Sequence, residues 1–345
     1  MEENAQTAQF DVENAVQQVL DSIDRERERE IISRRFGLFD RRETLEQIGE
    51  LLGITRERVR QLEKSILTKL KMSAENDLAV VKEAEKVLGG HLDSMGQVAR
   101  VSEVSNKLTK DNSKIDQARV SFLGLLSPGI TVVDDNDNFF HALAVAAGSS
   151  EKAIAAEVNK IIEAIGKIGE PTDINTVAKS IGAKDSKKVE ALASISKDLA
   201  HLHGRWGLTK WPMVNPKNIR DKIYVILHDA GKPMHFGEIA EAIKKSDFKR
   251  KDVTTQAIHN ELIKDKRFVL IGRGIYALRE WGYKKGTVAD VIAEVLRKEG
   301  GPLHRDEIVR RVLKSRHVKE TTILLNLQGK PQFKRVAKAT YTLAE

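Results

Sequence analysis

A pattern that recurs about every 65 to 70 residues constrains the fold of this chain more than any other feature. An aromatic residue stands two places before a leucine in Trp206-Gly207-Leu208, Tyr276-Ala277-Leu278 and Tyr341-Thr342-Leu343, and Leu143 precedes Leu208 by 65 positions. Units of this length are close to the lower limit for independent folding, so we expect a series of small modules that contact their neighbours.

The clearest copy of the repeat occupies residues 216–281. Its first part has apolar residues at helical spacing, and Gly231 and Pro233 end that helix. Two shorter helical patterns follow, and apolar residues then alternate on both sides of Gly272-Arg273-Gly274, which is typical of a β-hairpin. A three-helix unit that ends in a hairpin is predicted to be a winged helix.

Two further helices, separated by a glycine, are predicted within residues 44–71. Thr44 and Gln47 have the spacing of a capping box, and the apolar residues of the first helix are Leu45, Ile48, Leu51 and Leu52. Gly53 ends that helix, and Thr55 can cap a second one whose apolar stripe is Val59, Leu62, Ile66 and Leu70. Two helices joined by a tight turn form a helix-turn-helix.

The fold class is therefore predicted to be mainly α with small β-wings, a helix-turn-helix domain followed by tandem winged-helix domains. The predicted domains are residues 1–72 (helix-turn-helix), 77–147 (a degenerate winged helix), 151–213, 216–283 and 286–345 (a basic winged helix).

The second helix of the pair has a polar face that its core does not need: Arg56, Glu57, Arg60, Gln61 and Lys64. Arginine can donate two hydrogen bonds to guanine, glutamine can pair with adenine and a carboxylate can accept from cytosine, so the face suits a major groove. Arg58 and Lys69 are expected to point elsewhere. The alternative is an ordinary charged surface helix with pairs four residues apart.

Residues 12–71 resemble region 4 of the sigma-70 family. The matching motifs are REREIISRRFGL from Arg27, TLEQIG from Thr44 and TRERVRQLE from Thr55. The resemblance implies a domain that recognises the −35 promoter element and docks on the β-flap of RNA polymerase. Position by position, it implies that Arg56, Glu57 and Gln61 face bases, that Arg60 contacts phosphate or a base edge, and that Thr44 and Leu45 meet the DNA backbone. Lys64, on the same helix face, is also predicted to contact the backbone.

The resemblance covers only part of a sigma factor. About a dozen residues precede it, and the chain, with 5% aromatic residues, offers no aromatic-rich helix of the kind that melts the −10 element. We therefore do not expect this protein to open promoters as a complete sigma factor does.

The positive charge of the chain lies in its C-terminal third. Net charge is −2 for residues 1–72, −2 for residues 73–215 and +12 for residues 216–345. This distribution favours a polyanionic partner, double-stranded DNA ahead of a membrane surface, and the alternative is a solvated lysine-rich surface. Candidate backbone contacts are Lys249, Arg250, Lys251 and Arg273, and in the last unit Arg305, Arg310, Arg311, Lys314, Arg316, Lys319, Lys334, Arg335 and Lys338.

Residues 216–281 also resemble the HARE-HTH domain, a winged-helix family that includes the N-terminal domain of the RNA polymerase delta subunit. The motifs are PMHFGEIA from Pro233, Asn260-Glu261-Leu262 and GRGIYAL from Gly272. Delta carries a long acidic tail, whereas the last unit here is basic, so DNA binding is favoured over a delta-like role.

No catalytic motif accompanies these features. The chain has no cysteine, and its GxG at 272–274, its two histidines at 201 and 203 and its acidic run at 134–138 lack the further residues of a phosphate, zinc or calcium site. We expect no enzymatic activity, no cofactor, no membrane segment and a cytoplasmic, nucleoid-associated protein.

The sequence thus favours a DNA-binding transcription factor that associates with RNA polymerase. Two alternatives stay open: a protein–protein adaptor of RNA polymerase, and a nucleoid- or restriction-associated DNA-binding protein.

Overall fold

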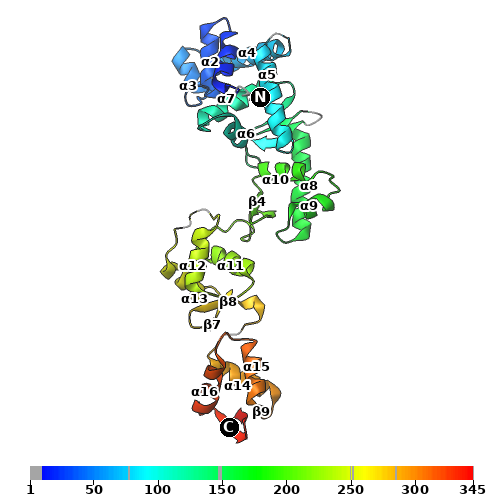
Figure 1. The fold of residues 1–345 in the computed structure, drawn as a ribbon. Coiled ribbons are helices and arrows are strands. Elements are labelled where there is room, and N and C mark those ends of the chain that lie inside the picture. The colour runs from blue at the N-terminus through cyan, green and yellow to red at the C-terminus, as the bar shows by residue number, and fades with distance from the viewer. Residues whose placement is uncertain are drawn as a thin grey trace, which may run out of the picture. The chain divides into compact units, whose positions relative to one another are not determined.

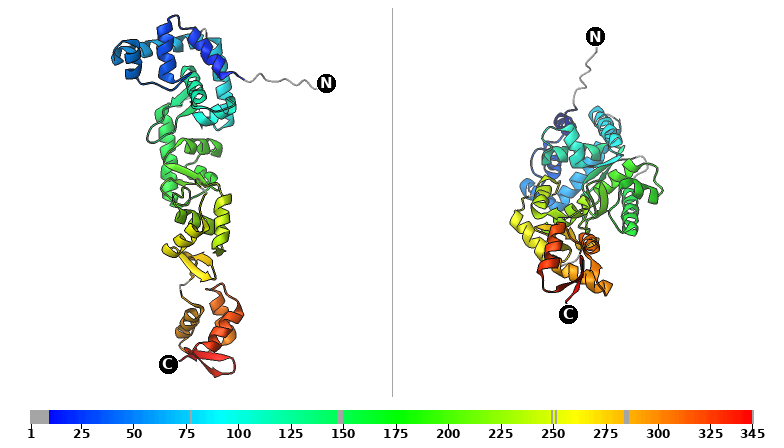
Figure 2. Two further views of the ribbon diagram at one scale, coloured as in Figure 1. Left: turned by 90° about the vertical axis from the view of Figure 1, so that its left-hand side faces the viewer. Right: turned by 60° about the horizontal axis from the view of Figure 1, so that its bottom comes forward.

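The computed structural model describes residues 10–76, 78–146, 150–248, 250, 252–283 and 286–344. Within these residues the chain forms sixteen α-helices and small antiparallel sheets (Figure 1), and helices also predominate in two further views (Figure 2). The chain divides into two compact units, Met1–Lys210 and Trp211–Glu345. No helix of the described part is both long and apolar enough to cross a membrane.

Four helices open the first unit: α1 (Val12–Asp21), α2 (Glu26–Phe36), α3 (Leu45–Leu52) and α4 (Arg56–Asn76). The predicted capping box of α3 is present, with Thr44 and Gln47 bonded in both directions, and Gly53 ends α3 at a φ of 64°. This left-handed backbone conformation favours glycine at the end of a helix. The helix-turn-helix predicted for this segment is confirmed.

One residue of this segment differs from the prediction. Leu51 was expected on the buried stripe of α3, but its side chain is 55% exposed, whereas Ile48 on the same helix is fully buried. The helical period places Leu51 at the edge of the apolar stripe, beyond Ile48 and away from Leu45 and Leu52.

The next elements of the first unit are α5 (Ala79–Ser94), β1 (Val98–Arg100), α6 (Val101–Leu108), α7 (Lys114–Leu126), β2 (Ile130–Val133) and β3 (Ala142–Val145). The three strands form an antiparallel sheet in the order β1-β3-β2.

A single hydrophobic core joins these elements to the helix-turn-helix. It contains Val16 of α1, Leu70 of α4, Leu88 of α5 and Phe122 of α7, each at most 4% exposed. Residues 1–72 and 77–147, predicted as separate domains, therefore share one core across their described parts.

The first unit ends with α8 (Glu151–Ile168), α9 (Ile174–Ser180), α10 (Ser186–Ile195), β4 (Leu199–Leu202) and β5 (Arg205–Leu208). An isolated β-bridge between Thr172 and Trp206 takes the place that strand β1 has in the sheet of β1, β2 and β3. The sheet of residues 151–213 is thus less regular than that of residues 77–147, which the sequence indicated as the degenerate copy.

The second unit contains two sets of elements in the same order. The first set is α11 (Ile219–Ala230), β6 (Met234–His235), α12 (Phe236–Lys245), α13 (Thr255–Lys264), β7 (Phe268–Gly272), β8 (Ile275–Leu278) and a 3-10 turn at Arg279–Trp281. The second is α14 (Val288–Glu299), β9 (Leu303–His304), α15 (Arg305–Leu313), α16 (Glu320–Gly329), β10 (Phe333–Ala337) and β11 (Thr340–Leu343).

Both sets place their strands alike. Their sheets have the orders β6-β8-β7 and β10-β11-β9, so the last strand lies between the other two. The same holds for β1, β2 and β3 of the first unit. The hairpins predicted around Gly272-Arg273-Gly274 and within residues 333–345 are confirmed as β7–β8 and β10–β11.

Candidate nucleic-acid interface

The turn between α3 and α4 is held by close backbone packing. Ile54 N–H donates to the Gly49 carbonyl at 2.9 Å, and a Cβ at position 49 would lie only 2.7 Å from the Ile54 carbonyl. Thr55 Oγ1 accepts from the Arg58 N–H at 3.2 Å, as expected for a residue that caps α4. Glycine at position 49 therefore allows the two helices to meet at this angle.

A small core and two arginines support the turn from behind. Ile31, Ile48 and Val59, one from each of α2, α3 and α4, are fully buried together. Arg27 Nη2 donates to the Leu52 carbonyl at the end of α3 at 2.6 Å, and Arg35 Nε lies 3.1 Å from Glu63 Oε1 on α4. The three helices are thereby fixed to one another through residues of the sequence motif.

The face predicted to contact DNA, called here the reading face, consists of Arg56, Glu57, Arg60, Gln61 and Lys64. All five side chains are exposed on α4. Arg60 binds Glu57 through two hydrogen bonds, at 2.7 Å from Nη2 and 2.9 Å from Nε, and Gln61 Nε2 lies 3.4 Å from the same carboxylate. The hydrogen bond from Arg60 lowers the pKa of Glu57, so the carboxylate accepts and stays ionised at neutral pH.

The side chain of Arg58 was predicted to point away from the reading face, but it lies beside it. Its Nη1 lies 3.4 Å from Gln61 Oε1, so its guanidinium reaches the edge of the reading face. A separation of three residues on a helix could have signalled this contact, because such residues are surface neighbours.

The two residues predicted to meet the DNA backbone at α3 differ in exposure. Thr44 is exposed and its hydroxyl accepts from the Gln47 N–H, whereas Leu45 is half-buried and packs against the small core of Ile31, Ile48 and Val59. Arg41 and Arg42, which the sequence analysis did not single out, are exposed immediately before α3. Their position ahead of a capped helix N-terminus gives this edge two further cations.

The candidate cations of residues 216–283 are only partly described. Lys249 and Lys251 lie outside the described residues. Arg250 is exposed with a φ of 57°, and its carbonyl accepts from Lys222 Nζ at 2.7 Å. Arg273 is exposed in the turn between β7 and β8.

Arg316 does not fit its predicted role as a phosphate contact. It is only 6% exposed, its Nη1 donates to the Leu270 carbonyl at 2.6 Å, and burial lowers its pKa. A guanidinium held against a backbone carbonyl in this way is not presented to solvent.

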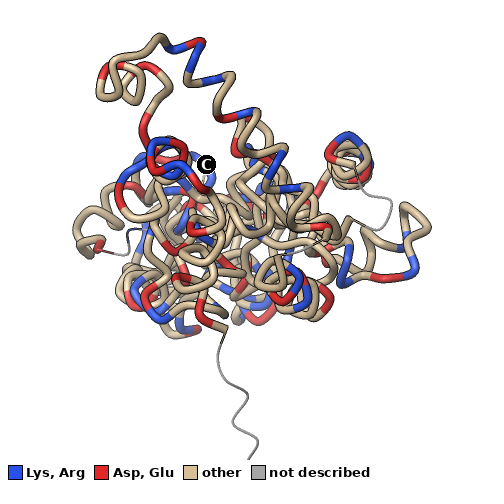
Figure 3. Tube along the Cα trace, turned by 90° about the horizontal axis from the view of Figure 1, so that it is seen from above, with Lys and Arg blue, Asp and Glu red and all other residues tan. Residues whose placement is uncertain are grey.

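Lysine and arginine are interspersed with aspartate and glutamate along the chain (Figure 3). Helix α15 is one example. Arg310 and Arg311 both bind Glu307, at 2.8 and 2.6 Å, and lower its pKa to about 2. Arg305 Nε lies 3.2 Å from Asp306. These three arginines are therefore engaged within their own module.

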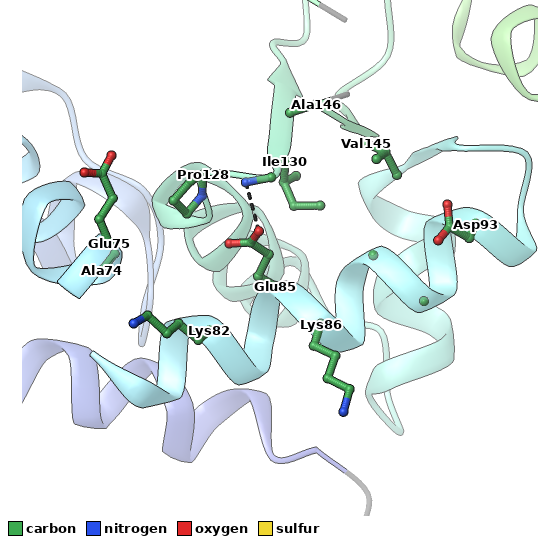
Figure 4. A pocket seen from close by; sticks show the side chains of 13 residues that line it. Ala74, Glu75, Lys82, Glu85, Lys86, Asp93, Pro128, Ile130, Val145 and Ala146 are labelled. Atoms are coloured by element: carbon green, nitrogen blue, oxygen red, sulfur yellow. Dashed lines mark hydrogen bonds between the residues drawn. The ribbon is translucent and has the colours of Figure 1, made fainter. Parts of the chain in front are cut away.

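An open cavity of about 860 Å³ lies between α5 and the ends of β2 and β3 (Figure 4). Glu85 Oε1 accepts from the Gly129 N–H at 3.1 Å across it, and Lys82, Lys86 and Asp93 also line it. Charges of both signs give this cavity no preference for an anion. Among the described residues, no group of histidines and carboxylates has the arrangement of a metal site.

Comparison with known proteins assigns the N-terminal segment. Residues 25–72 match the family model for sigma-70, region 4. The chain is 50% identical over 60 residues to RNA polymerase sigma factor sigB of Arabidopsis thaliana, covering 17% of this chain and 10% of that protein. It is 48% identical over 63 residues to RNA polymerase sigma factor RpoD of Helicobacter pylori, strain 26695, covering 18% of this chain and 9% of that protein.

A third relative, RNA polymerase sigma factor SigA of Nostoc sp., is 45% identical over 69 residues, 20% of this chain and 17% of the relative. The chain thus matches only a small part of each sigma factor. The family match covers α2, α3 and most of α4, so the described helix-turn-helix lies within the segment that is similar to sigma-70 region 4.

Proposed function

We propose that this chain is a DNA-binding transcription factor in which α4 recognises a −35-like promoter sequence. The observation that carries the proposal is the reading face: five exposed polar side chains on one helix, within the segment that matches sigma region 4. Arg56 and Gln61 supply donors for guanine and adenine, and the major groove is wide enough to admit the helix. Glu57 accepts two hydrogen bonds from Arg60 and so restricts the orientation of the Arg60 guanidinium.

The proposal extends to a partner. The relatives are RNA polymerase sigma factors, so we infer that the N-terminal module associates with RNA polymerase, with the β-flap as its docking site. The matched segment corresponds to region 4 alone, and we propose no promoter-melting activity for it. We further propose that it works in the cytoplasm at the nucleoid, without an enzymatic role and without a cofactor.

The remaining modules are proposed to be tandem winged helices, with residues 216–283 of the HARE type. The support is the order of helix, strand, two helices and hairpin, with the last strand in the middle of the sheet, which residues 79–145, 219–278 and 288–343 share. Residues 151–208 have three helices and a hairpin, and an isolated bridge from Thr172 to Trp206 takes the place of the first strand. A single module buries roughly 600–1,000 Å² of its surface when it binds DNA, which is a small interface. Linking several modules raises the effective concentration of each module at its DNA site, so weak contacts add up.

A double variant tests the base-reading role. Two bidentate contacts give about 2–6 kcal/mol of discrimination, so Arg56→Ala with Gln61→Ala should lower the preference for a −35-like duplex over a scrambled one by roughly 30-fold or more. Binding that depends on salt should remain, because the other cations are unchanged. The control is Lys69→Ala with Lys71→Ala, two exposed positions farther along α4. An unchanged preference in the first variant contradicts the proposal.

A second candidate function is an RNA polymerase adaptor without DNA binding. It is favoured by the net charge of −2 over residues 73–215 and by the core that joins part of this segment to the helix-turn-helix. Retention of RNA polymerase through high salt, together with no mobility shift of any duplex, would establish this alternative and exclude the first.

A further inference from the structure

The hairpin β10–β11 at the end of the second unit carries three exposed cations: Lys334, Arg335 and Lys338. Of strand β10, only Phe333 is buried. Within the described part of the chain none of the three cations forms an ion pair, and Arg335 Nε donates to the carbonyl of Ala337 at 3.2 Å. The hairpin therefore presents three positive charges that nearby carboxylates do not neutralise.

Three other cations of the same module are paired with carboxylates. Lys298 Nζ lies 3.7 Å from Glu294, Arg305 lies 3.2 Å from Asp306 and Arg310 lies 2.8 Å from Glu307. A phosphate that bound these groups would have to compete with an existing carboxylate. The hairpin cations face no such competition within the described residues.

The third helix of this module, α16, offers little to DNA. Its ten residues include no lysine or arginine, and its first turn carries Glu320. Ile323 and Leu327 are buried, whereas Leu325 is 68% exposed. Asn326 Nδ2 donates a hydrogen bond to the Thr322 carbonyl at 2.7 Å. The nearest cations are Lys319 and Lys330, one at each end of the helix.

We propose that the C-terminal module binds the DNA backbone through its β10–β11 hairpin, with Lys334, Arg335 and Lys338 on phosphates, and not through α16. The proposal rests on the proposed DNA-binding function and names the surface that this module uses. Lys334 and Arg335 lie in β10 and Lys338 lies in the turn that follows it, so the three cations extend from the strand to the tip of the hairpin.

The test uses the full chain and a duplex of arbitrary sequence, with affinity measured over a range of salt concentrations. The hairpin variant is Lys334→Gln, Arg335→Gln and Lys338→Gln. If all three cations contact phosphate, the slope of log affinity against log salt becomes shallower by about 2.7, because each phosphate contact contributes about 0.9.

Two matched variants separate the hairpin from its surroundings. The charge control, Lys298→Gln with Arg305→Gln and Arg310→Gln, removes the same charge from paired positions and should change the slope by less than one phosphate contact, about 0.9. The helix variant, Thr321→Ala with Leu325→Ala and Gln328→Ala, should leave the slope unchanged.

Several outcomes overturn the proposal. Equal slope changes in the hairpin variant and the charge control would mean that only net charge matters. A loss of affinity in the α16 variant as large as that in the hairpin variant would make the helix the contact. Since β10 is an edge strand, its cations could instead block strand pairing between chains. In that case the hairpin variant would self-associate and keep its slope.

The result also distinguishes this proposal from the function on which it rests. An unchanged slope in the hairpin variant, with sequence preference still lost in the Arg56 and Gln61 variant, would refute the hairpin contact alone. Failure of the unaltered chain to bind any duplex would refute both.

Discussion

Replacing Arg119 with methionine should loosen the attachment of α7 to the helix-turn-helix. Arg119 is 8% exposed, its Nε donates to the Leu38 carbonyl at 2.7 Å, and its Nη2 lies 2.9 Å from Glu13 on α1. Its guanidinium also stands 5.0 Å from the centre of the Phe39 ring. One side chain thus joins α7 to α1 and to the loop that follows α2.

The expected cost can be worked out contact by contact. A hydrogen bond to a charged group contributes about 1.5–3 kcal/mol, and its loss leaves the Leu38 carbonyl without this donor. The Glu13 carboxylate is 62% exposed, so its ion pair adds about 0–1 kcal/mol. Methionine retains most of the apolar packing of the arginine stem. We expect a loss of about 2–3 kcal/mol.

Thermal unfolding of the full chain measures this loss. For a unit of about 200 residues, 1 kcal/mol shifts the Tm by about 2–4 °C, so Arg119→Met should lower the transition of the first unit by roughly 4–12 °C. Arg41→Met is the control, because that side chain is exposed. If both variants unfold within about 1 °C of the unaltered chain, Arg119 does not stabilise the shared core and the reasoning fails.

Three further predictions concern other sites. Glu57→Gln should raise non-specific DNA affinity and weaken sequence preference, because it removes a negative charge and the ionic partner of Arg60; competition binding measures both, and unchanged values would refute the orienting role. Gly96→Ala should destabilise the first unit by about 1–3 kcal/mol, since its φ is 89° and a Cβ would lie 2.6 Å from a carbonyl of α10. Gly89→Ala, in open space on α5, is its control and should be stabilising by about 0.5–1 kcal/mol; denaturant unfolding that ranks the two variants otherwise contradicts the prediction. The pKa of Glu307 is lowered from 4.5 to about 2, so its contribution to stability is complete above pH 4.5 and is lost as the pH falls toward 2. Glu307→Gln should flatten the stability profile of the second unit in that pH range, and an unaltered profile would exclude this carboxylate as its cause.

Local features of the chain were predictable because they depend on neighbouring residues. Three such features are the capping box at Thr44, the glycine that ends α3 and the hairpin turn at residues 272–274. Each of them depends on residues only a few positions apart. The stripe of α4 follows from the helical period, and Val59 and Ile66 are buried as predicted. The reading face follows from the same period, since α4 exposes all five of its residues.

Pairing and burial between distant segments depended on the tertiary structure. Nothing near Arg119 in the sequence indicates its hydrogen bond to Leu38, 81 positions away, or the core that α7 shares with α1 and α4. Arg316 and Leu51 show the same limit: a basic residue is buried against a backbone carbonyl, and an apolar residue is exposed. The sequence by itself determined which residues form helices, turns and the reading face, because helix periodicity and capping act over one or two turns. Only the tertiary structure decided which charges remain free and which modules share a core, because those depend on contacts between residues far apart in the chain.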